Sequence, residues 1–338
     1  MVKNPLHSFV LLITVLSICF AADNPTSGFI DHLVKKGESV SLICIDYYGY
    51  YSKELGTAFQ KDNPLIKDIN VIVPGRTLRF RSPGTAQAKT AESAPAAASD
   101  DSLFVKKVAA QQGVVTFVEG TVTLFRKGVN TGENLLVNTI ITPGDKIKTS
   151  TNGRAEIIIN RETVVRLQEK SMITIEAYRN IGKTRGKTKI GFSAGTVWTK
   201  MKKFQDKISR FELELPNAVA GVHGTVYQTS VNADKSSEIK VFTGEVSVHG
   251  KSGDPGTLRQ GRGKGVQEVA GPTEVAGPTE VNLETWVRIV KSMQKVVIDK
   301  NGNASAARPF SPDTTNAWES WNRERDTRIQ EMFEENAP

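Results

Sequence analysis

Cysteine and histidine are scarce in this chain, which has two cysteines and four histidines among 338 residues. Cys19 falls in an apolar N-terminal run, so a mature chain would keep only Cys44 and could form no internal disulfide. No Cys-x-x-Cys pair and no His-Glu-x-x-His sequence occurs, and these absences exclude the common zinc motifs. We therefore expect no metal, no cofactor and no catalytic residue, and a buried, inert thiol at Cys44.

Long hydrophobic runs are also missing. The most apolar segment, Phe9–Phe20, follows Lys3 and ends beside the small residue Ala21. It is too short for a comfortable membrane span, and its order of positive, apolar and small residues is typical of a secretory signal. We expect residues 1–21 to be a signal peptide, with an uncleaved anchor as the alternative. The mature protein would then be exported to the periplasm, be associated with the cell wall, and have no transmembrane segment beyond the signal.

Acidic residues are the minority charge, with 36 Asp and Glu against 44 Lys and Arg. The basic excess concentrates between Arg179 and Arg210, where Asp206 is the only acid. Aromatic residues do not interleave there as they do on surfaces that stack nucleobases, and the expected export also argues against nucleic acid. The region is either a contact for anionic glycans, lipid headgroups or an acidic protein, or a solvated rim of a β-domain.

Residues 30–81 carry the signals of two short helices between two strands. Ser39 and Ser52 are each placed to cap a helix. Asn63-Pro64 ends the second helix, and Pro74-Gly75 makes a turn before an alternating strand. This order, with the sequences GES, DNP and I-x-P-G-x-x-L at their separations, resembles the LysM module.

The LysM resemblance implies a βααβ fold and binding to glycans that contain N-acetylglucosamine, such as peptidoglycan. In LysM modules the glycan lies across the loop after the first strand and the loop before the second. Backbone groups there can pair with the acetamide of the sugar. The matching glycan-binding residues here are Gly37, Glu38, Ser39, Asn63, Pro64, Leu65 and Ile66.

Between residues 108 and 250 the hydrophobic period changes to two, which predicts an all-β domain, solenoid-like or sandwich-like. Asn152-Gly153 stands between two strand-like runs and predicts a hairpin. The segments VEGTVTL (118–124), SAGTVWT (193–199) and FTGEVSV (242–248) each place a glycine before an alternating strand, as repeated β units with tight corners require. Low-complexity stretches at 82–107 and 251–280, the second with a repeated EVAGPT, predict flexible linkers.

The segment Pro216–Gln228 reads PNAVAGVHGTVYQ. Together with PGDKIKTSTNGRAEIII before it and VFTGEVSV after it, it resembles the FecR domain over residues 108–250. The motif residues are Gly221, Val222, His223, Gly224 and Thr225, with His223 where the family usually has arginine. The resemblance implies a periplasmic β module that contacts other proteins. Founding members are inner-membrane regulators that sense a transporter signal and control a sigma factor, but this chain lacks their mid-chain membrane helix.

Residues 281–338 follow the three-four spacing of amphipathic helices. The pattern predicts one helix from Leu283 to Val297 and a second over Thr315–Phe333, which contains Trp318 and Trp321. We expect both to pack onto the β-domain, with binding of a partner as the alternative.

The best pair of carboxylates for an enzyme is Glu212 and Glu214, which share one strand face. Their neighbours Phe211, Leu213 and Leu215 should fill the inward face, so both acids should face solvent, where carboxylates are rarely tuned for catalysis.

The sequence therefore predicts a multidomain, non-enzymatic cell-envelope protein. A βααβ LysM-like module would bind peptidoglycan, and an all-β FecR-type domain with C-terminal amphipathic helices would engage an unknown envelope protein. The main alternative is an envelope sensor or regulator related to FecR-type anti-sigma regulators. A cell-wall hydrolase ranks third.

Overall fold

The computed structural model describes residues 28–83, 113–159, 163–178, 187–202, 210–222, 224–251 and 287–335. The expected signal peptide and nearly all of the two expected linkers lie outside these ranges. Among the described helices, none combines the length and apolar character that a membrane crossing requires.

The N-terminal module, residues 28–83, has the predicted βααβ order. Its elements are β1 (Phe29–Leu33), α1 (Val40–Tyr48), α2 (Lys53–Asp62) and β2 (Thr77–Arg81), and β1 pairs antiparallel with β2. The hydroxyls of Ser39 and Ser52 accept hydrogen bonds from backbone N–H groups in the first turns of α1 and α2, as their positions predicted. The Asn63 amide bonds to both backbone groups of Arg79 and thereby ties the end of α2 to β2.

Seventeen strands form one continuous sheet, which we call the β-domain. They are β3 (Gly113–Glu119), β4 (Val122–Phe125), β5 (Glu133–Asn134), β6 (Ile140–Ile141), β7 (Lys146–Thr149), β8 (Arg154–Ile159), β9 (Thr163–Leu167), β10 (Met172–Ala177), β11 (Lys187–Met201), β12 (Arg210–Glu214), β13 (Ala218–Val222), β14 (Val226–Val231), β15 (Ser237–Thr243), β16 (Glu245–Gly250), β17 (Val287–Lys291), β18 (Gln294–Ile298) and β19 (Arg308–Pro309).

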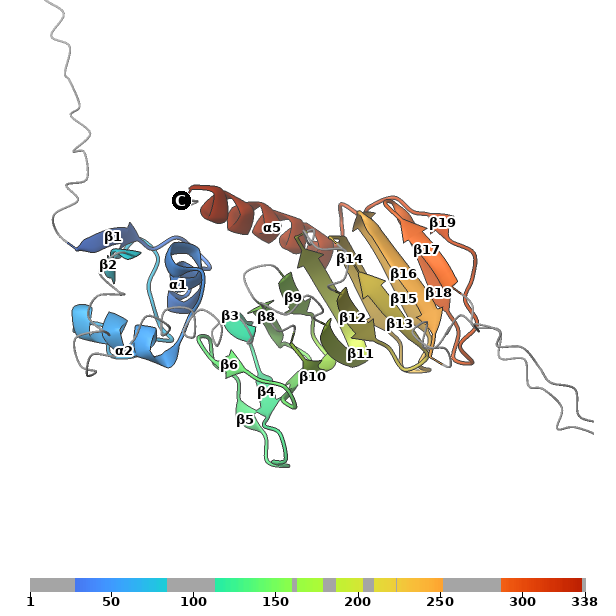
Figure 1. Ribbon diagram of the computed structural model, residues 1–338, viewed down its shortest axis with the longest axis horizontal. Coiled ribbons are helices and arrows are strands. Elements are labelled where there is room, and N and C mark those ends of the chain that lie inside the picture. The colour runs from blue at the N-terminus through green and yellow to red at the C-terminus, as the bar shows by residue number, and fades with distance from the viewer. Residues whose placement is uncertain are drawn as a thin grey trace, which may run out of the picture.

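The sheet folds over into two layers because β11 takes part in both (Figure 1). The first layer runs β6-β3-β8-β9-β11-β14-β15-β18-β19. The second layer runs β5-β4-β7-β10-β11-β12-β13-β16-β17. The described pairs are antiparallel except β11 with β12, which is parallel. The prediction of an all-β domain is confirmed, and its described strands form one curled sheet.

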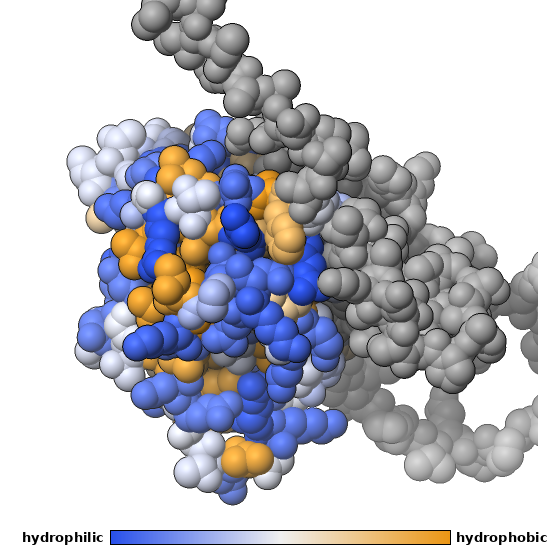
Figure 2. All heavy atoms as spheres, turned by 90° about the vertical axis from the view of Figure 1, so that its left-hand side faces the viewer, coloured by the Kyte–Doolittle hydropathy of each residue, from blue (hydrophilic) through white to orange (hydrophobic). Residues whose placement is uncertain are grey.

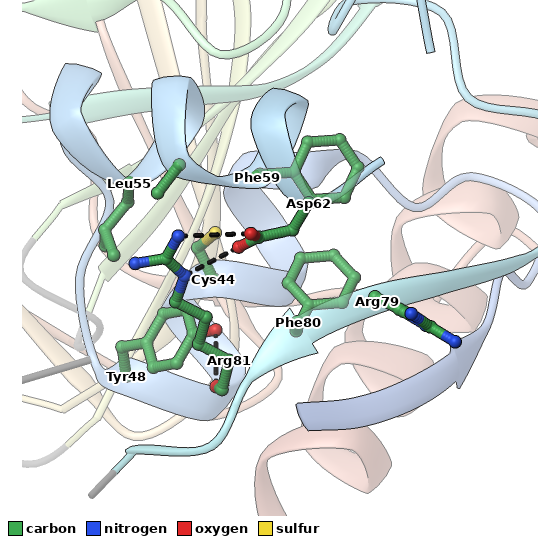
Figure 3. Close-up of a pocket in the computed structure, with 9 residues that line it drawn as sticks. Cys44, Tyr48, Leu55, Phe59, Asp62, Arg79, Phe80 and Arg81 are labelled. Carbon is green, nitrogen blue, oxygen red and sulfur yellow. Dashed lines mark hydrogen bonds and ion pairs between the residues drawn. The ribbon is translucent and has the colours of Figure 1, made fainter. Parts of the chain in front are cut away.

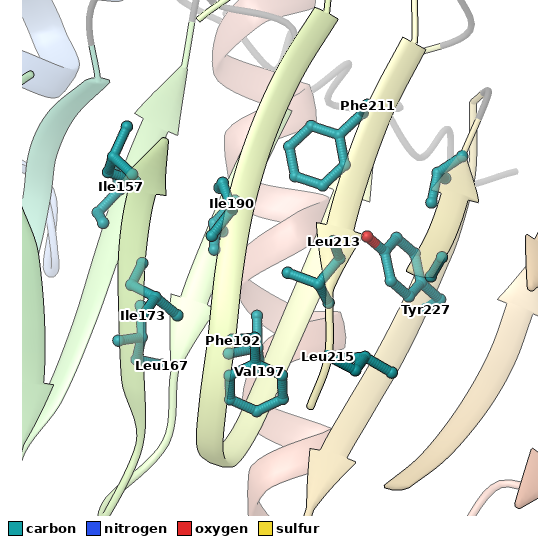
Figure 4. Close-up of a cluster of buried hydrophobic side chains, with 14 of the residues drawn as sticks. Ile157, Leu167, Ile173, Ile190, Phe192, Val197, Phe211, Leu213, Leu215 and Tyr227 are labelled. Atoms are coloured by element: carbon teal, nitrogen blue, oxygen red, sulfur yellow. The ribbon is translucent and has the colours of Figure 1, made fainter. Parts of the chain in front are cut away.

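The core lies between the two layers and consists of inward-facing side chains at alternate positions (Figure 4). Ile157 and Leu167 come from the first layer, and Ile173 and Leu213 from the second; all four are fully buried. Each such side chain contributes on the order of 1.5–3 kcal/mol relative to an exposed one. This alternation is the period-two pattern that the sequence showed.

Glycines mark the places where the chain passes from one layer to the other. Gly120 and Gly244 connect consecutive strands of different layers, and Gly195 lies at the bend of β11; all three have positive φ, of 63°, 86° and 93° respectively. The three repeated segments of the sequence are therefore repeated corners, as predicted. Hydroxyls connect neighbouring corners, for example Ser171 Oγ to Thr196 O at 3.0 Å.

The hairpin predicted at Asn152-Gly153 is wrong. This dipeptide connects β7 to β8, but β7 pairs with β4 and β10, while β8 pairs with β3 and β9. The turn chemistry was identified correctly, but it makes a corner between layers. Only the non-local partners of each strand distinguish a corner from a hairpin.

The helix predicted from Leu283 to Val297 is also wrong where the chain is described. Residues 287–298 form β17 and β18, which join the free edges of the second and first layers. The sequences VRIVK and QKVVI are rich in β-branched residues, and the unpaired edges of β16 and β15 supply the hydrogen-bond partners that decide for strands.

The C-terminal helix α5 (Ala317–Glu335) matches the second predicted helix and packs on the β-domain, as expected. It crosses the outer face of the first layer (Figure 1) and binds a side chain on each of several strands. Trp198 Nε1 on β11 donates to Asp326 Oδ2 at 3.1 Å, and Lys240 Nζ on β15 lies 3.5 Å from Glu319 Oε1.

The corners generate a test. We expect Gly244→Ala to destabilise the protein by at least about 2 kcal/mol, because its positive φ resists a side chain and an added Cβ would lie 2.6 Å from the backbone oxygen of Gly224. The matched control is Gly128→Ala, whose φ is also positive but which has open space around it; strain alone should cost about 1 kcal/mol. Urea unfolding measures both, and equal costs would contradict the close-packed corner.

Candidate interaction site between the N-terminal module and the β-domain

Helix α1 is buried on all sides. Residues 40–45 read VSLICI, and every one of them is at most 3% exposed. The helix is enclosed between its own module and the apolar residues Val114, Ile158 and Val164 of the β-domain. A helix that is apolar all round must be covered all round. The N-terminal module is therefore docked onto β3, β8 and β9.

Asn138, between β5 and β6, provides the polar centre of this contact. Its Oδ1 accepts a hydrogen bond from the backbone N–H of Ser41 in the first turn of α1, at 2.8 Å. Its Nδ2 donates to the carbonyl of Ile69 at 3.0 Å and to Oδ1 of Asn70 at 3.2 Å. One β-domain side chain thus joins the start of α1 to the loop between α2 and β2.

The far end of α5 closes over the same module. Arg325 Nη1 donates to the Gly37 carbonyl at 3.0 Å, and Arg328 Nη1 donates to the Lys36 carbonyl at 2.8 Å. Ile329 and Met332 are buried in the apolar cluster that includes α1. The helix therefore bridges the β-domain and the β1–α1 loop.

A buried ionic cluster holds α5 on the β-domain. Glu156 of β8 accepts hydrogen bonds from Arg166 Nε at 2.7 Å, from Arg325 Nε and Nη2 at 2.7 Å each, and from Thr116 Oγ1 at 2.6 Å. Arg166 Nη1 also pairs with Asp326 Oδ1 at 2.7 Å. Burial alone would raise the pKa of Glu156, but the two arginine charges and the hydrogen bonds outweigh burial and lower its pKa to about 2. The carboxylate stays ionised.

The first predicted glycan-binding loop is occupied by these contacts. The Gly37 carbonyl is bound by Arg325, as described above. The Glu38 side chain is turned inward, and its Oε2 lies 2.9 Å from His32 Nε2. Ser39 is buried as the cap of α1. Gly37 and Glu38 are therefore half-buried and Ser39 is buried, and Gly37 lies at the contact with α5.

The second predicted loop is partly exposed. Asn63 and Ile66 are buried within the module, whereas Pro64 and Leu65 face solvent, Leu65 with 77% of its surface exposed. Val71 and Val73 of the same loop are exposed as well. The end view in Figure 2 shows apolar surface among hydrophilic side chains on this side of the molecule. Asn138 connects the start of α1, through Ser41, to the α2–β2 loop, through Ile69 and Asn70.

A small pocket within the module is too small to hold a sugar. It lies among α1, α2 and β2, where Arg81 Nε bonds Asp62 Oδ2 at 2.6 Å in front of Cys44 (Figure 3). Its volume of about 20 Å³ has room for roughly one water. Burial raises the pKa of the Cys44 thiol, so this cysteine is protonated and inert, as predicted.

The FecR-like motif residues form a layer crossing. Gly221 lies in β13 opposite Ser247 of β16, and Val222, the last residue of β13, is buried. Gly224 has a φ of 78°, and the buried Thr225 donates its hydroxyl to the Glu245 carbonyl at 3.0 Å. His223 lies outside the described residues. The described residues of the motif therefore have a structural role, at the corner between β13 and β14.

Two features that suggest an enzyme have structural explanations. Residues 191–195 read GFSAG, the spacing of a serine-hydrolase elbow, but Ser193 lies inside strand β11 with its hydroxyl 3.3 Å from the Met172 carbonyl. Glu214 pairs with Lys189 and with Lys251, and the hydrogen bonds from these lysines lower its pKa. A general acid needs a raised pKa instead.

Two lysines of the basic region, Lys189 and Lys200, have partners. Lys189 pairs with Glu176 as well as with Glu214, and Lys200 Nζ donates to the Asp326 carbonyl of α5 at 3.1 Å. Residues 179–186 and 203–209 of the region lie outside the described ranges.

Sequence reasoning missed Asn138 and the Glu156 cluster. The signal for the cluster was present, since Glu156 and Arg166 interrupt otherwise apolar runs in RAEIII and TVVRL. A charge on a buried strand requires a partner. No comparable feature of the local sequence distinguishes Asn138.

Residues 145–247 match the model of the FecR protein family. No curated protein matches the chain. Two solved structures, at 1.65 Å and 2.50 Å resolution, of a protein described as an anti-sigma factor from Parabacteroides distasonis are similar to it, with TM-scores of 0.34 and 0.35 and identities of 13% and 12%. In both cases the alignment covers 51% of this chain and 63% of the other, so this chain spans less than two thirds of their length.

The ionic cluster predicts a large loss on neutralisation. Glu156→Gln should cost about 3–5 kcal/mol of unfolding free energy, because it leaves Arg325 buried without a counter-charge and leaves Arg166 with Asp326 alone. The control is Glu324→Gln on the exposed side of α5, whose pair with Arg328 should contribute less than about 0.5 kcal/mol. Urea unfolding at pH 7 compares them, and a similar small loss in both would contradict the cluster's role.

The lowered pKa of Glu156 also predicts acid sensitivity. The stability that the ionised carboxylate contributes is present above its ordinary pKa of 4.5 and is lost as pH falls towards about 2. The difference in urea midpoint between wild type and Glu156→Gln should therefore narrow as pH falls through this window. A difference that stays constant from pH 7 to pH 2.5 would be inconsistent with it.

Proposed function

We propose that this chain is a non-enzymatic envelope regulator, whose FecR-type domain contacts another envelope protein. The observation that carries the proposal is the FecR match over residues 145–247. That match begins at β7 and ends within β16, so it covers most of the β-domain but neither the N-terminal module nor α5.

The outer face of the second layer is the surface that best suits a partner. The outer face of the first layer carries α5 and the N-terminal module, whereas no described helix packs on the second. Its side chains carry both signs of charge, with Lys146 and Lys148 on β7 and Glu176 on β10 exposed. A surface of this kind favours a polar partner that is recognised by charge complementarity.

A site-specific test uses a photo-crosslinking amino acid at Lys148, compared with the same amino acid at Lys67, an exposed lysine of the N-terminal module. In the source cell we expect position 148 to crosslink one envelope protein, and position 67 not to. Deleting the gene should change transcription of a set of envelope genes, and wild type should restore it. Identical crosslinks at both positions, together with an unchanged transcript profile, would contradict the regulator.

A second candidate function is glycan binding by the N-terminal module. The observation that favours it is the βααβ order together with a place that already holds an amide group, that of Asn138, between the start of α1 and the α2–β2 loop. The exposed Leu65 beside those loops is suited to pack on the less polar face of a sugar. One such module buries little area, so its binding should be weak.

Co-sedimentation with insoluble peptidoglycan tests this second function. We expect measurable pelleting of the mature chain at high peptidoglycan loading, and a loss of pelleting in Leu65→Asp. Val129→Asp, at an exposed apolar position of the β-domain, is the control and should pellet like wild type. Pelleting that disappears in high salt for every variant would instead assign the contact to charge.

A further inference from the structure

We propose that Asn138 of the β-domain occupies a glycan-binding position of the N-terminal module, between the start of α1 and the α2–β2 loop, so that glycan and β-domain compete for this position. The inference rests on the proposed glycan-binding function and adds a regulation to it. Its physical core is the amide of Asn138, an internal substitute for the acetamide group of an N-acetylated sugar.

The two amides offer the same chemistry. An acetamide presents one carbonyl acceptor and one N–H donor, and the Asn138 side chain presents the same pair. Its carbonyl oxygen accepts from the Ser41 N–H, one of the groups that a helix start leaves without an intrahelical partner. Its NH₂ group donates to the Ile69 carbonyl of the opposite loop. A sugar acetamide bound between the start of α1 and the α2–β2 loop would compete for the Ser41 N–H and the Ile69 carbonyl.

The structure holds Asn138 rigidly in this position. The residue has a φ of 64°, a left-handed conformation that asparagine adopts more readily than most residues. Its backbone N–H donates to the Val115 carbonyl at 2.7 Å, and the same carbonyl accepts from the Ser41 hydroxyl at 3.1 Å. Only 8% of Asn138 is exposed. The amide is thus held in this position in a single orientation.

Helix α5 adds a second closure beside this position. The Lys36 and Gly37 carbonyls belong to the β1–α1 loop. The Lys36 carbonyl accepts a hydrogen bond from Arg328, and the Gly37 carbonyl accepts one from Arg325. Arg325 is at the same time bound to Glu156 through two nitrogens. A glycan that binds both the β1–α1 loop and the start of α1 must therefore displace the end of α5 and the Asn138 amide.

Opening also has an apolar cost, because Val114, Ile158 and Val164 would lose the cover of α1. The closed form therefore lowers the apparent affinity in proportion to the fraction of molecules that are open. If about one molecule in 100 is open, the apparent affinity falls about 100-fold. Weakening the closure should recover part of this factor without any new contact to the sugar.

The test compares full-length mature protein with the double variant Asn138→Gly, Arg328→Ala. Glycine tolerates the positive φ while removing the amide, and Arg328 lies outside the Glu156 cluster, so both changes should leave the fold intact. The control is Asn232→Gly, Arg323→Ala, which changes an exposed asparagine and the α5 arginine that pairs with Glu319. Calorimetric titration with a soluble N-acetylglucosamine tetramer measures affinity, and hydrogen exchange at the Ser41 amide measures opening.

We expect at least tenfold tighter binding and faster Ser41 exchange in the double variant, with the control like wild type. Equal, measurable affinity in all three proteins would overturn the competition while leaving glycan binding in place. No binding in any protein, despite faster Ser41 exchange in the double variant, would overturn the glycan-binding function and the competition with it.

Discussion

The structure depends above all on the ionised Glu156 between two arginines. A buried carboxylate is tolerated only where charged partners and hydrogen bonds replace its water, and Arg166, Arg325 and Thr116 do this. Arg166 comes from the neighbouring strand and Arg325 from a helix 169 residues further along the chain. Because α5 completes these ion pairs only where Arg325 reaches Glu156 and Asp326 reaches Arg166, α5 has one favourable register on the sheet. That register also places Arg325 and Arg328 over the N-terminal module.

Much of the local structure could be predicted because local chemistry determines it. The capping serines Ser39 and Ser52 and the glycine corners behave as their sequence positions indicate. The errors arose where pairing with strands remote in the sequence decides the structure of a segment. Asn152-Gly153 is a sound turn signal, but the identity of the strands beside β7 and β8 makes it a corner. Residues 287–298 fit a helix by spacing, and the open edges of β15 and β16 make them strands.

The candidate site shows the same division. The seven predicted glycan-binding residues lie on the two expected loops, because the module builds those loops by itself. The contacts that Asn138, Arg325 and Arg328 make beside these residues arise from docking, and a motif within residues 30–81 holds no information about docking partners. One sign of the docking was present in the sequence, because the run VSLICI leaves α1 without a polar face. A helix with no polar face implies a second apolar surface against it, which here is supplied by β3, β8 and β9.

This arrangement also connects the two proposed functions. The FecR match includes Glu156 and Arg166, which bind α5, and α5 binds the β1–α1 loop of the module. Coupling between two sites is reciprocal in free energy. If a glycan must displace the end of α5 to bind, then a partner that stabilises α5 on the β-domain weakens glycan binding, and glycan weakens that partner's hold equally. The buried carboxylate of Glu156 would then set the strength of the coupling, because Arg325 binds both Glu156 and the Gly37 carbonyl of the module.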